Sequence, residues 1–422
     1  MERAPLFSLG TASTAIRRML LLFSGLLILV GLCSDSPADI AHGLWRIITE
    51  PDMLITDYVA LGGQGAAFVN AGLVMLLSVL LLQLCRLPFS GVSIACCFLM
   101  GGFALFGKNL LTISPIPLGV WLYARCQRQP FSRYVYVALF GTALSPIITE
   151  MGLAMRGRGL LTLLVPLAVG MGIGFLLPPV SAFTVKVHQG YNLYNVGFSA
   201  GLLGVLLVAV LRTWGFVFTV RTIWSTQRPV SLAIVLFAAF GAMFAAGALA
   251  ANGDWKALRR ITRHSGRAIA DFVVLDGLPV TLMNMGLLGI AGTAFVLAIG
   301  APLNGPSIGG ILTIVGFGAF GKHLANCVWV VAGLSLMCWS AGWSLQEPNI
   351  LLAALFSTGL APIAGQFGWA AGMAAGALHL AVVTGVGGLY EGMNLYNNGF
   401  AAGLVCIVLV PVLEALKGDQ AE

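Results

Sequence analysis

Long apolar stretches separated by short polar gaps run along the whole chain. Several contain only about 16 to 19 residues and carry Pro or Gly, whereas a helix needs roughly 20 apolar residues to span the hydrocarbon core. The pattern predicts an all-α, polytopic transmembrane bundle of about 12–14 segments, some of them broken or re-entrant. The stretches fall near 16–33, 58–84, 89–107, 109–124, 135–153, 159–178, 192–211, 230–251, 271–300, 303–321, 324–343, 349–369, 370–388 and 394–414.

The second half of the chain repeats the first. A shift of 214 positions aligns a long block without a gap, and small length changes align two further blocks. Given as first copy and second copy, the blocks are 57–108 with 271–322, 142–147 with 358–363, and 190–198 with 392–400. We therefore predict two tandem transmembrane repeats, residues 1–228 and 229–422.

Equivalent loops of the two repeats differ in charge. The loop after the first stretch carries Asp35, Asp39, Glu50 and Asp52, whereas its copy at 256–267 is basic. Such opposite loops are typical of opposite sides of a membrane. Seven crossings per repeat and a cytoplasmic N-terminus put 15 Lys and Arg inside and 7 outside, and a parallel arrangement gives 13 and 9. We therefore expect inverted repeats with a cytoplasmic N-terminus.

Composition excludes most other classes of protein. The chain is 59% hydrophobic and 9% charged, whereas soluble domains carry roughly 25% charged residues. The net charge of +7 does not indicate a nucleic-acid partner, because the basic residues lie mostly in short gaps between apolar stretches. The eight cysteines form no CxxC motif, and no metal or cofactor is expected. Arg17 and Arg18 precede an apolar run that lacks a signal-peptide cleavage site, so we expect a retained first helix.

The strongest candidate site is a duplicated Asn-Leu-Tyr-Asn sequence just before an apolar stretch in each repeat. A helix break present in both repeats is the usual pointer to a binding site at the midplane of a transporter. Amide and phenol groups there are able to replace the hydration shell of a solute. The alternative is plain helix capping with tyrosine as an interfacial anchor. The candidate substrate-binding residues are Asn192, Tyr194, Asn195, Asn394, Tyr396 and Asn397.

Other polar residues within apolar stretches are candidates for the same pathway. We expect Asn70 and Asn284 to face the bundle interior. They serve there either as solute ligands or as hydrogen-bonding contacts between helices. Intramembrane ionisable groups are functional hypotheses by default, and the alternative for each is a solvated loop end. Coupling or pathway roles are predicted for Glu150, Gln366, Glu391, Lys108 and Lys322, with His188, His323 and His379 as relays.

Two short motifs carry weaker predictions. Residues 102–108 and 316–322 match GxxxxGK, but neither continues with the Ser or Thr of a nucleotide-binding loop. Residues 197–201 match the GxSxG motif of serine hydrolases, but the second copy has Ala401 at the serine position. The GxxxG spacing in both copies favours close helix packing instead.

Through the duplicated Asn-Leu-Tyr-Asn-x-Gly-Phe motif, the sequence resembles an uncharacterised family of bacterial multi-pass membrane proteins, a domain of unknown function. This resemblance implies location in the bacterial cytoplasmic (inner) membrane and brings no activity. More loosely, Gly63-Gln64-Gly65 with Phe68 and Asn70, and Gly190-Tyr191-Asn192, are similar to urea transporters. That similarity implies an inverted duplication.

The expected function is transport, by a transporter or channel, of a small neutral or zwitterionic solute at the interface of the two repeats. A membrane-embedded enzyme and a membrane protein without transport activity are the alternatives. The expected partners are the lipid bilayer and a small-molecule solute, with no nucleic acid, and a homo-oligomer is compatible with the sequence.

Overall fold

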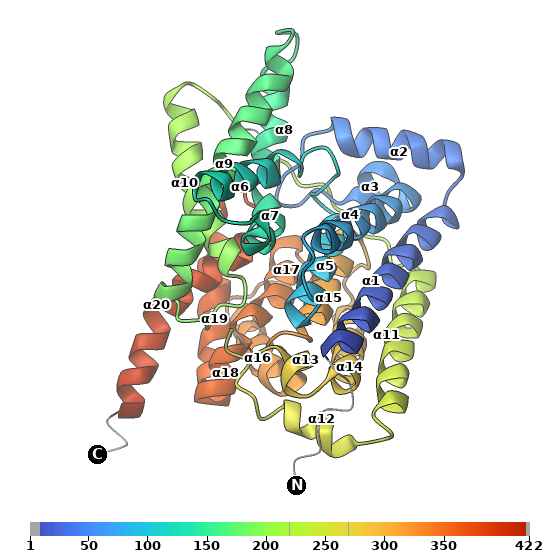
Figure 1. Cartoon of the computed structure of the whole chain (residues 1–422). Coiled ribbons are helices and arrows are strands. Elements are labelled where there is room, and N and C mark those ends of the chain that lie inside the picture. Colours follow the sequence, from blue (N-terminus) through green and yellow to red (C-terminus); the bar gives the residue numbers. More distant parts are fainter. Residues whose placement is uncertain (1–8, 219, 269, 419–422) are drawn as a thin grey trace.

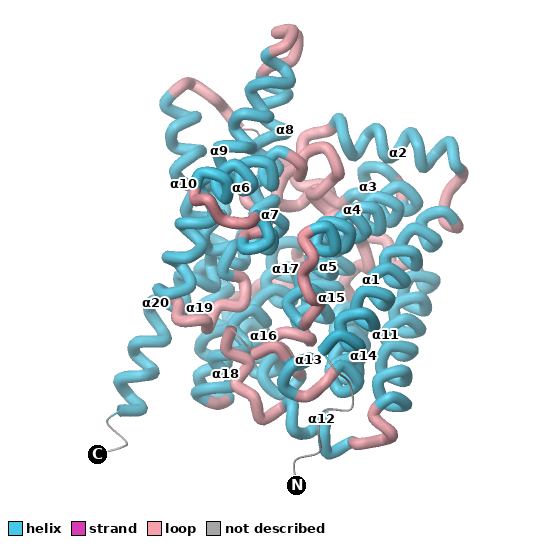
Figure 2. The backbone as a smooth tube through the Cα atoms, viewed as in Figure 1, coloured by secondary structure: helices cyan, strands magenta, loops and turns pink. Residues whose placement is uncertain are grey.

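Helices joined by short loops make up the chain in the computed structural model (Figures 1 and 2), which describes residues 9–218, 220–268 and 270–418. Within these ranges no strand forms. In the described part of the chain, ten helical segments are long and apolar enough to cross a membrane, and three shorter apolar helices accompany them. The predicted all-α polytopic bundle is confirmed.

The first repeat begins with a long helix and ends with the helix that follows the first Asn-Leu-Tyr-Asn motif. Its α-helices are α1 (Leu9–Leu32), α2 (Pro37–Thr49), α3 (Tyr58–Gly62), α4 (Gln64–Leu84), α5 (Gly91–Phe103), α6 (Pro115–Cys126), α7 (Val135–Gly141), α8 (Ser145–Ala154), α9 (Leu161–Val187) and α10 (Asn195–Thr213). The 3₁₀ turns η1 (Phe131–Arg133) and η2 (Thr142–Leu144) flank α7.

The second repeat follows the same order, and the border expected at residues 228 and 229 falls just before its first helix. The α-helices are α11 (Val230–Ala250), α12 (Trp255–Ile261), α13 (Phe272–Leu275), α14 (Leu278–Ala298), α15 (Gly305–Phe317), α16 (Leu324–Ser340), α17 (Pro348–Ser357), α18 (Ala361–Phe367), α19 (Trp369–Val386) and α20 (Asn397–Gly418). The 3₁₀ turns are η3 (Thr358–Leu360) and η4 (Gly387–Tyr390).

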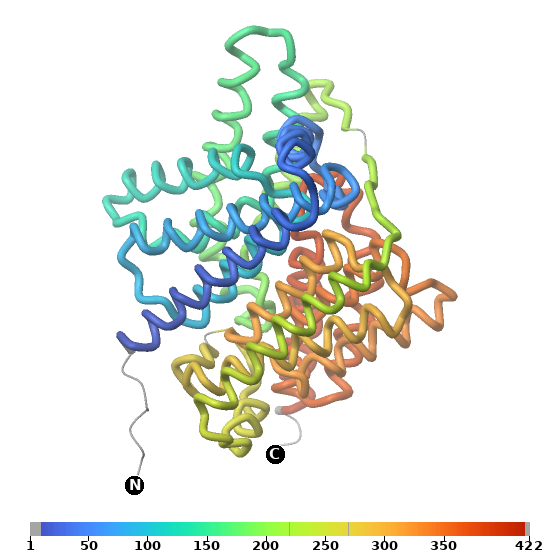
Figure 3. Tube along the Cα trace, turned by 90° about the vertical axis from the view of Figure 1, so that its right-hand side faces the viewer, coloured from blue at the N-terminus to red at the C-terminus, as the bar shows by residue number. Residues whose placement is uncertain are grey.

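Equivalent helices of the two repeats run in opposite directions. The start of α5 at Gly91 lies against Ala319 beyond the end of α15, and the start of α15 at Gly305 lies against Leu105 beyond the end of α5. Helices α1 and α11 are also antiparallel, as are α10 and α20 (Figures 1 and 3). The second repeat is therefore inverted relative to the first, as its loop charges indicate.

Each repeat caps the central short helix of the other. The Asp57 carboxylate accepts a hydrogen bond from the Gly305 backbone N–H at 3.1 Å, at the start of α15. The Asp271 carboxylate accepts one from the Gly91 N–H at 2.9 Å, at the start of α5. The first N–H groups of a helix have no partner within the helix, and a carboxylate there also stabilises the helix dipole. These two caps fix α5 and α15 side by side.

Glycine is required where α3 meets α4 and where α13 meets α14. Gly63 has φ 89° and ψ 161°, and its copy Gly277 has φ 86° and ψ 156°. A side chain is strained in this backbone conformation. The chain turns sharply at these positions into the long helices that carry Asn70 and Asn284.

The molecule has two loop-bearing faces that differ in charge. The Asp52 face contains loop 50–57 and the start of α11, because Asp57 and Ser225 are hydrogen-bonded there. The Asp271 face contains the start of α1 and loop 262–271, because the Phe89 N–H reaches Ser13 and the Gly91 N–H reaches Asp271. Most of the basic loop residues lie on the Asp271 face: Arg86, Arg125, Arg128, Arg133, Lys186, Lys256, Arg259, Arg260, Arg263 and Arg267.

Candidate functional site

The two Asn-Leu-Tyr-Asn loops meet between the repeats. The Asn192 side-chain amide donates a hydrogen bond to the Gly399 carbonyl oxygen at 2.9 Å. Gly197 and Gly399 face each other so closely that a Cβ on Gly197 would lie 3.0 Å from the Gly399 Cα. The two polar breaks that the duplication predicts are therefore in direct contact.

Each of these loops also binds the helix break of the opposite repeat. The Leu193 N–H donates to the Gly359 carbonyl oxygen in η3 at 3.0 Å, and the Leu395 N–H donates to the Ala143 carbonyl oxygen in η2 at 2.9 Å. An unpaired backbone group in hydrocarbon costs several kcal/mol, so irregular backbone at membrane depth needs such partners. The helix breaks of the two repeats therefore provide hydrogen-bond partners for each other's backbone groups.

Lys108 and Lys322 lie buried behind the tyrosines of these loops. The Lys108 ammonium donates to the Tyr396 hydroxyl at 2.5 Å, and the Lys322 ammonium donates to the Tyr194 hydroxyl. Lys322 also donates to the Thr358 hydroxyl at 2.7 Å, whereas Lys108 has only the Met100 sulfur at 3.3 Å. Among the described residues no carboxylate lies within 4.0 Å of either ammonium group. Each pair joins the two repeats.

Asn70 and Asn284 hold the backbone that carries the two lysines. The Asn70 amide donates to the carbonyl oxygens of Ala104 and Lys108 at 2.7 and 2.8 Å. The Asn284 amide makes the same pair of bonds to the Gly318 and Lys322 carbonyl oxygens, both at 2.7 Å. Neither side chain lines the central cavity described next. Their contacts match those expected of a hydrogen bond between helices.

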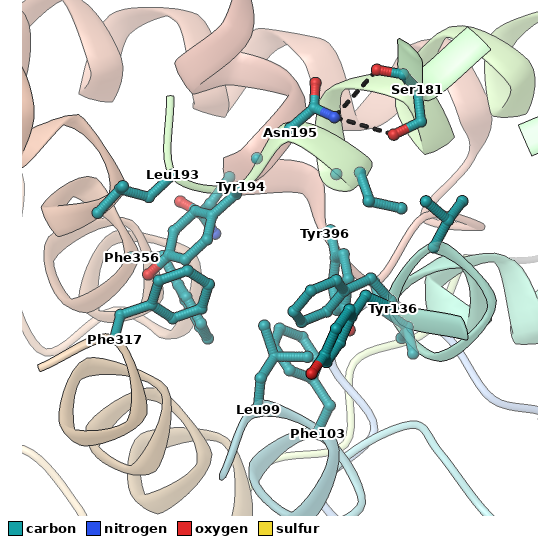
Figure 4. Close-up of a pocket in the computed structure, with 17 residues that line it drawn as sticks. Leu99, Phe103, Tyr136, Ser181, Leu193, Tyr194, Asn195, Phe317, Phe356 and Tyr396 are labelled. Atoms are coloured by element: carbon teal, nitrogen blue, oxygen red, sulfur yellow. Dashed lines mark hydrogen bonds between the residues drawn. The ribbon is translucent and has the colours of Figure 1, made fainter. Parts of the chain in front are cut away.

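A cavity of about 200 Å³, the central cavity, lies where the repeats meet (Figure 4). Many of its walls come in equivalent pairs, with Tyr194 and Phe317 on one side and Tyr396 and Phe103 on the other. Each tyrosine packs edge-on against the phenylalanine, with ring centroids 5.1 Å apart for the first pair and 4.6 Å for the second. The remaining lining residues are Leu99, Tyr136, Val137, Phe140, Ser181, Leu193, Asn195, Val196, Gly197, Phe356, Leu395, Asn398 and Gly399.

Asn195 and Asn397 are largely engaged in hydrogen bonds to neighbouring helices. The Asn195 amide NH₂ donates to the Ser181 hydroxyl at 2.9 Å, and its oxygen accepts from Thr184 and His188, both at 2.8 Å. Asn397 accepts from the Tyr390 hydroxyl and donates to a carbonyl oxygen of α19 at 3.2 Å. Asn195 lines the central cavity, and Asn397 lines a second cavity on the Asp52 face.

Asn192 and Asn394 differ although they occupy equivalent positions. Each accepts a hydrogen bond from the tyrosine N–H two residues later, at 2.9 and 3.0 Å. The Asn192 amide NH₂ then binds Gly399, but the buried Asn394 NH₂ has no hydrogen-bond partner among the described residues. Both asparagines therefore cap the backbone N–H of the following tyrosine. Of the two amide NH₂ groups, that of Asn192 makes the hydrogen bond to the other repeat.

The three acid and amide candidates for coupling lie away from the central cavity. Glu150 is half-buried in α8, and Gln366 is exposed at the end of α18. Glu391 forms an ion pair with Arg212 near the surface. Of the predicted relays, His379 donates from its Nε2 to the side-chain oxygen of Asn398, which does line the cavity, at 3.0 Å. His188 contacts Asn195, and His323 contacts the His264 carbonyl oxygen at 3.0 Å.

The GxSxG segment packs the repeats together. A Cβ on Gly201 would lie 2.3 Å from the Phe400 ring, and a Cβ on Gly403 would lie 2.3 Å from the Phe198 ring. The Ser199 hydroxyl contacts Thr184 and the Asn195 carbonyl oxygen. These contacts match the close packing that the GxxxG spacing favours.

Sequence reasoning missed part of the site. Phe103 and Phe317 stand in the aligned GxxxxGK blocks, so their duplication was a usable signal for a paired wall. Asp52 was recognised only as one acid in an acidic loop, yet it is completely buried. Nothing in the local sequence separates it from its exposed neighbour Asp39.

The fold and the site together define a membrane-embedded helical protein of two inverted repeats that enclose a cavity at their interface. The family model described as "Protein of unknown function (DUF1576)" matches residues 36–213 and 251–415, one match in each repeat. The chain belongs to this family. Neither the curated proteins nor the solved structures contain a significant match.

Proposed function

We propose that this protein is a transporter or channel of the bacterial cytoplasmic membrane that moves a small neutral or zwitterionic solute through the central cavity. The observation that carries the proposal is the position of this cavity between equivalent aromatic residues of two inverted repeats. Inverted repeats with discontinuous helices at their interface are the usual architecture of a transport site. In this proposal Tyr194, Tyr396 and Asn195 contact the solute, and the other predicted amides hold the backbone around it.

The lining of the central cavity favours a solute without net charge. Its walls are mainly aromatic and aliphatic, with polar groups from Ser181, Asn195 and Asn398, and no charged side chain of the described residues lines it. Lys108 and Lys322 donate to the tyrosine hydroxyls. A lone ion would pay a large desolvation cost in such a place, whereas a neutral solute would need only a few hydrogen bonds.

The size of the cavity sets a further limit on the solute. A water molecule occupies about 30 Å³ of liquid, so about 200 Å³ holds the equivalent of roughly six waters. Solutes as small as urea, glycerol and glycine fit this space.

Light-scattering measurements on proteoliposomes test the proposal. Urea, glycerol and glycine gradients are applied in turn, and the expected result is flux of at least one solute above that of protein-free vesicles. Val137→Trp fills the central cavity and should lower that flux about tenfold or more. Val210→Trp adds the same ring to a residue of α10 that is 48% exposed and should leave it unchanged. Equal flux in both variants, or normal flux in both Asn192→Ala and Asn394→Ala, would count against the site.

The proposed orientation places the Asp271 face in the cytoplasm, because cytoplasmic loops carry an excess of Lys and Arg. Single cysteines introduced at Asp39 and at Lys256 in a cysteine-free background should react with an impermeant thiol reagent from opposite sides of the cell membrane. Labelling of Asp39→Cys from the periplasm supports the orientation, and labelling from the cytoplasm reverses it.

A further inference from the structure

Asp52 is a buried carboxyl group surrounded by neutral hydrogen-bond donors. It has no exposed surface. One carboxylate oxygen accepts from the Tyr58 hydroxyl at 2.6 Å, and the other accepts from the Asn109 amide at 3.2 Å and the Thr149 hydroxyl at 3.5 Å. These donors come from α3, the turn after Lys108, and α8.

The charged groups near Asp52 do not neutralise it by contact. The charge of Arg221 lowers the pKa of Asp52 without direct contact. The Arg221 guanidinium binds Glu50 at 3.3 Å and the Pro51 carbonyl oxygen at 2.7 Å. The charge of Glu150 raises the pKa of Asp52. Among the described residues no Lys, Arg or His nitrogen lies within 4.0 Å of the Asp52 carboxylate. Burial raises the pKa of Asp52 to about 7, against the lowering effect of Tyr58, Thr149 and Arg221.

Loop 50–57 is connected to the central cavity through two routes. Asn109 donates a hydrogen bond to Asp52 through its amide NH₂. Its amide oxygen accepts hydrogen bonds from the N–H groups of Leu111 and Thr112, which fixes the turn that follows Lys108. The Leu54 N–H donates to the Gly392 carbonyl oxygen at 3.0 Å, just before the second Asn-Leu-Tyr-Asn loop. Both routes therefore lead to the Lys108–Tyr396 pair at the cavity wall.

A second cavity gives the loop a polar environment on the Asp52 face. Its volume is about 440 Å³, and it is lined by Met53, Leu54, Arg221, Glu347, Asn349 and Asn397, among others. A cavity with several polar partners of this size is suited to hold water. Asn397, which lines this cavity, follows Tyr396, which lines the central cavity.

The inverted copy lacks the acid. The alignment places Gly266, Phe272, His323 and Gly365 where the first repeat has Asp52, Tyr58, Asn109 and Thr149. The equivalent join is made between the His323 ring and the His264 carbonyl oxygen. An acid at this position therefore occurs in the first repeat only, whereas Asp276 of the second repeat is paired with the His264 ring at 2.8 Å.

We propose that Asp52 is a proton-binding site on one face of the protein, and that its protonation controls the Lys108–Tyr396 contact and thereby solute passage. The control of passage rests on the proposed transport function, and the proton site does not. A protonated carboxyl oxygen is a donor, so the proton turns the Asn109 amide, which is also a donor, away from it. The Thr149 hydroxyl then accepts the new hydrogen bond. The Asn109 amide then keeps its 3.3 Å hydrogen bond to the Ile47 carbonyl oxygen but loses the one to Asp52, and the turn that carries Lys108 loosens.

Infrared titration of the purified full-length protein tests the proton site without any solute. The carbonyl signal of buried carboxylic acids should have a component that disappears with a midpoint near pH 7, from Asp52, and a component near pH 6, from the buried Asp57. The component near pH 7 should be lost in Asp52→Asn and retained in Asp39→Asn and in Glu150→Gln, which remove an exposed and a half-buried acid. A component near pH 7 that persists in Asp52→Asn, or that is lost in Glu150→Gln instead, overturns the assignment.

Tyr58→Phe gives a second test that does not remove the acid. It deletes the 2.6 Å hydrogen bond that favours the carboxylate and introduces the residue found at the equivalent position 272. The midpoint should rise by about one pH unit, a tenfold tighter proton affinity. An unchanged or lower midpoint contradicts the geometry on which the proposal rests.

The pH profile of flux tests the control of passage. With a solute that the light-scattering assay finds to permeate, flux in the original protein should change about tenfold across the titration midpoint, and flux in Asp52→Asn should not follow pH. An identical profile in both overturns the control. Absence of flux for every solute, with the infrared titration intact, refutes the transport function and leaves the proton site established.

Discussion

In each repeat, a side chain links the turn after the central short helix to a neighbouring loop, and this link is called the join here. The residues that form it differ between the two repeats. In the first repeat, Asn109 links the turn after α5 to loop 50–57 through the Asp52 carboxylate. In the second, His323 links the turn after α15 to loop 262–271 through the His264 carbonyl oxygen, and the other ring nitrogen accepts the Asn326 N–H at 3.2 Å. A neutral imidazole satisfies both bonds at once. The geometry of the join is the same in both repeats, but a carboxylate bonds the turn directly only in the first; in the second, Asp276 binds the His264 ring at 2.8 Å instead.

One of the two largest expected effects tests whether the helix caps supplied by Asp57 and Asp271 contribute equally to stability. Asp57→Ala and Asp271→Ala each leave a cross-repeat helix start without its cap. Each should lower the free energy of unfolding by about 3 kcal/mol, because bonds to charged groups are strong and the donors stay buried. Denaturant unfolding in detergent measures this. A loss in only one variant would show that the caps are not equivalent.

The next effect isolates the acid. Since the pKa of Asp52 rises from 3.8 to about 7 on folding, the folded protein holds a proton that the unfolded chain releases. Its contribution to stability therefore falls as pH rises from about 4 to about 7 and is constant above that. Asp52→Asn should gain about 4 kcal/mol relative to the original protein between those pH values. Parallel stability curves for the two proteins would exclude this linkage.

A smaller difference is expected between the two tyrosines. Tyr396→Phe leaves the Lys108 ammonium with the Met100 sulfur, whereas Tyr194→Phe leaves Lys322 with the Thr358 hydroxyl at 2.7 Å. The first variant should be less stable than the second by about 1 kcal/mol. Thermal unfolding monitored by tryptophan fluorescence compares them. The reverse order would mean that the lysines have partners other than these.

The smallest effect concerns the surface ion pair of Arg212 and Glu391. The Arg212 side chain is 51% exposed, and exposed pairs contribute about 0.2 to 1 kcal/mol. Arg212→Gln should therefore change stability by less than about 1 kcal/mol and leave the infrared titration unchanged. A shifted titration midpoint would bring Glu391 into the proton site.

Much of the fold could be predicted from the sequence because hydrophobic length and internal duplication are local or nearly local signals. The apolar stretches match the helices, and opposite charges on equivalent loops indicated the inversion. The roles of the amide side chains were harder to predict, because an asparagine serves equally well as a helix cap, as a hydrogen-bonding contact between helices or as a solute ligand. Asn70 illustrates this: only its two bonds to the end of α5 distinguish these roles.

Partners between the repeats could not be predicted. Lys108 and Tyr396 are 288 positions apart, and their pairing depends on how two complete bundles dock. The burial of Asp52 has the same origin, since Tyr58, Asn109 and Thr149 close around it only in the folded chain.

The exchange of caps between Asp57 and Asp271 means that neither repeat alone is a finished unit. A first repeat expressed alone would leave the start of α5 without the Asp271 carboxylate, and a second repeat expressed alone would leave the start of α15 without that of Asp57. Each half therefore needs the other, in the opposite orientation, to complete its central helix.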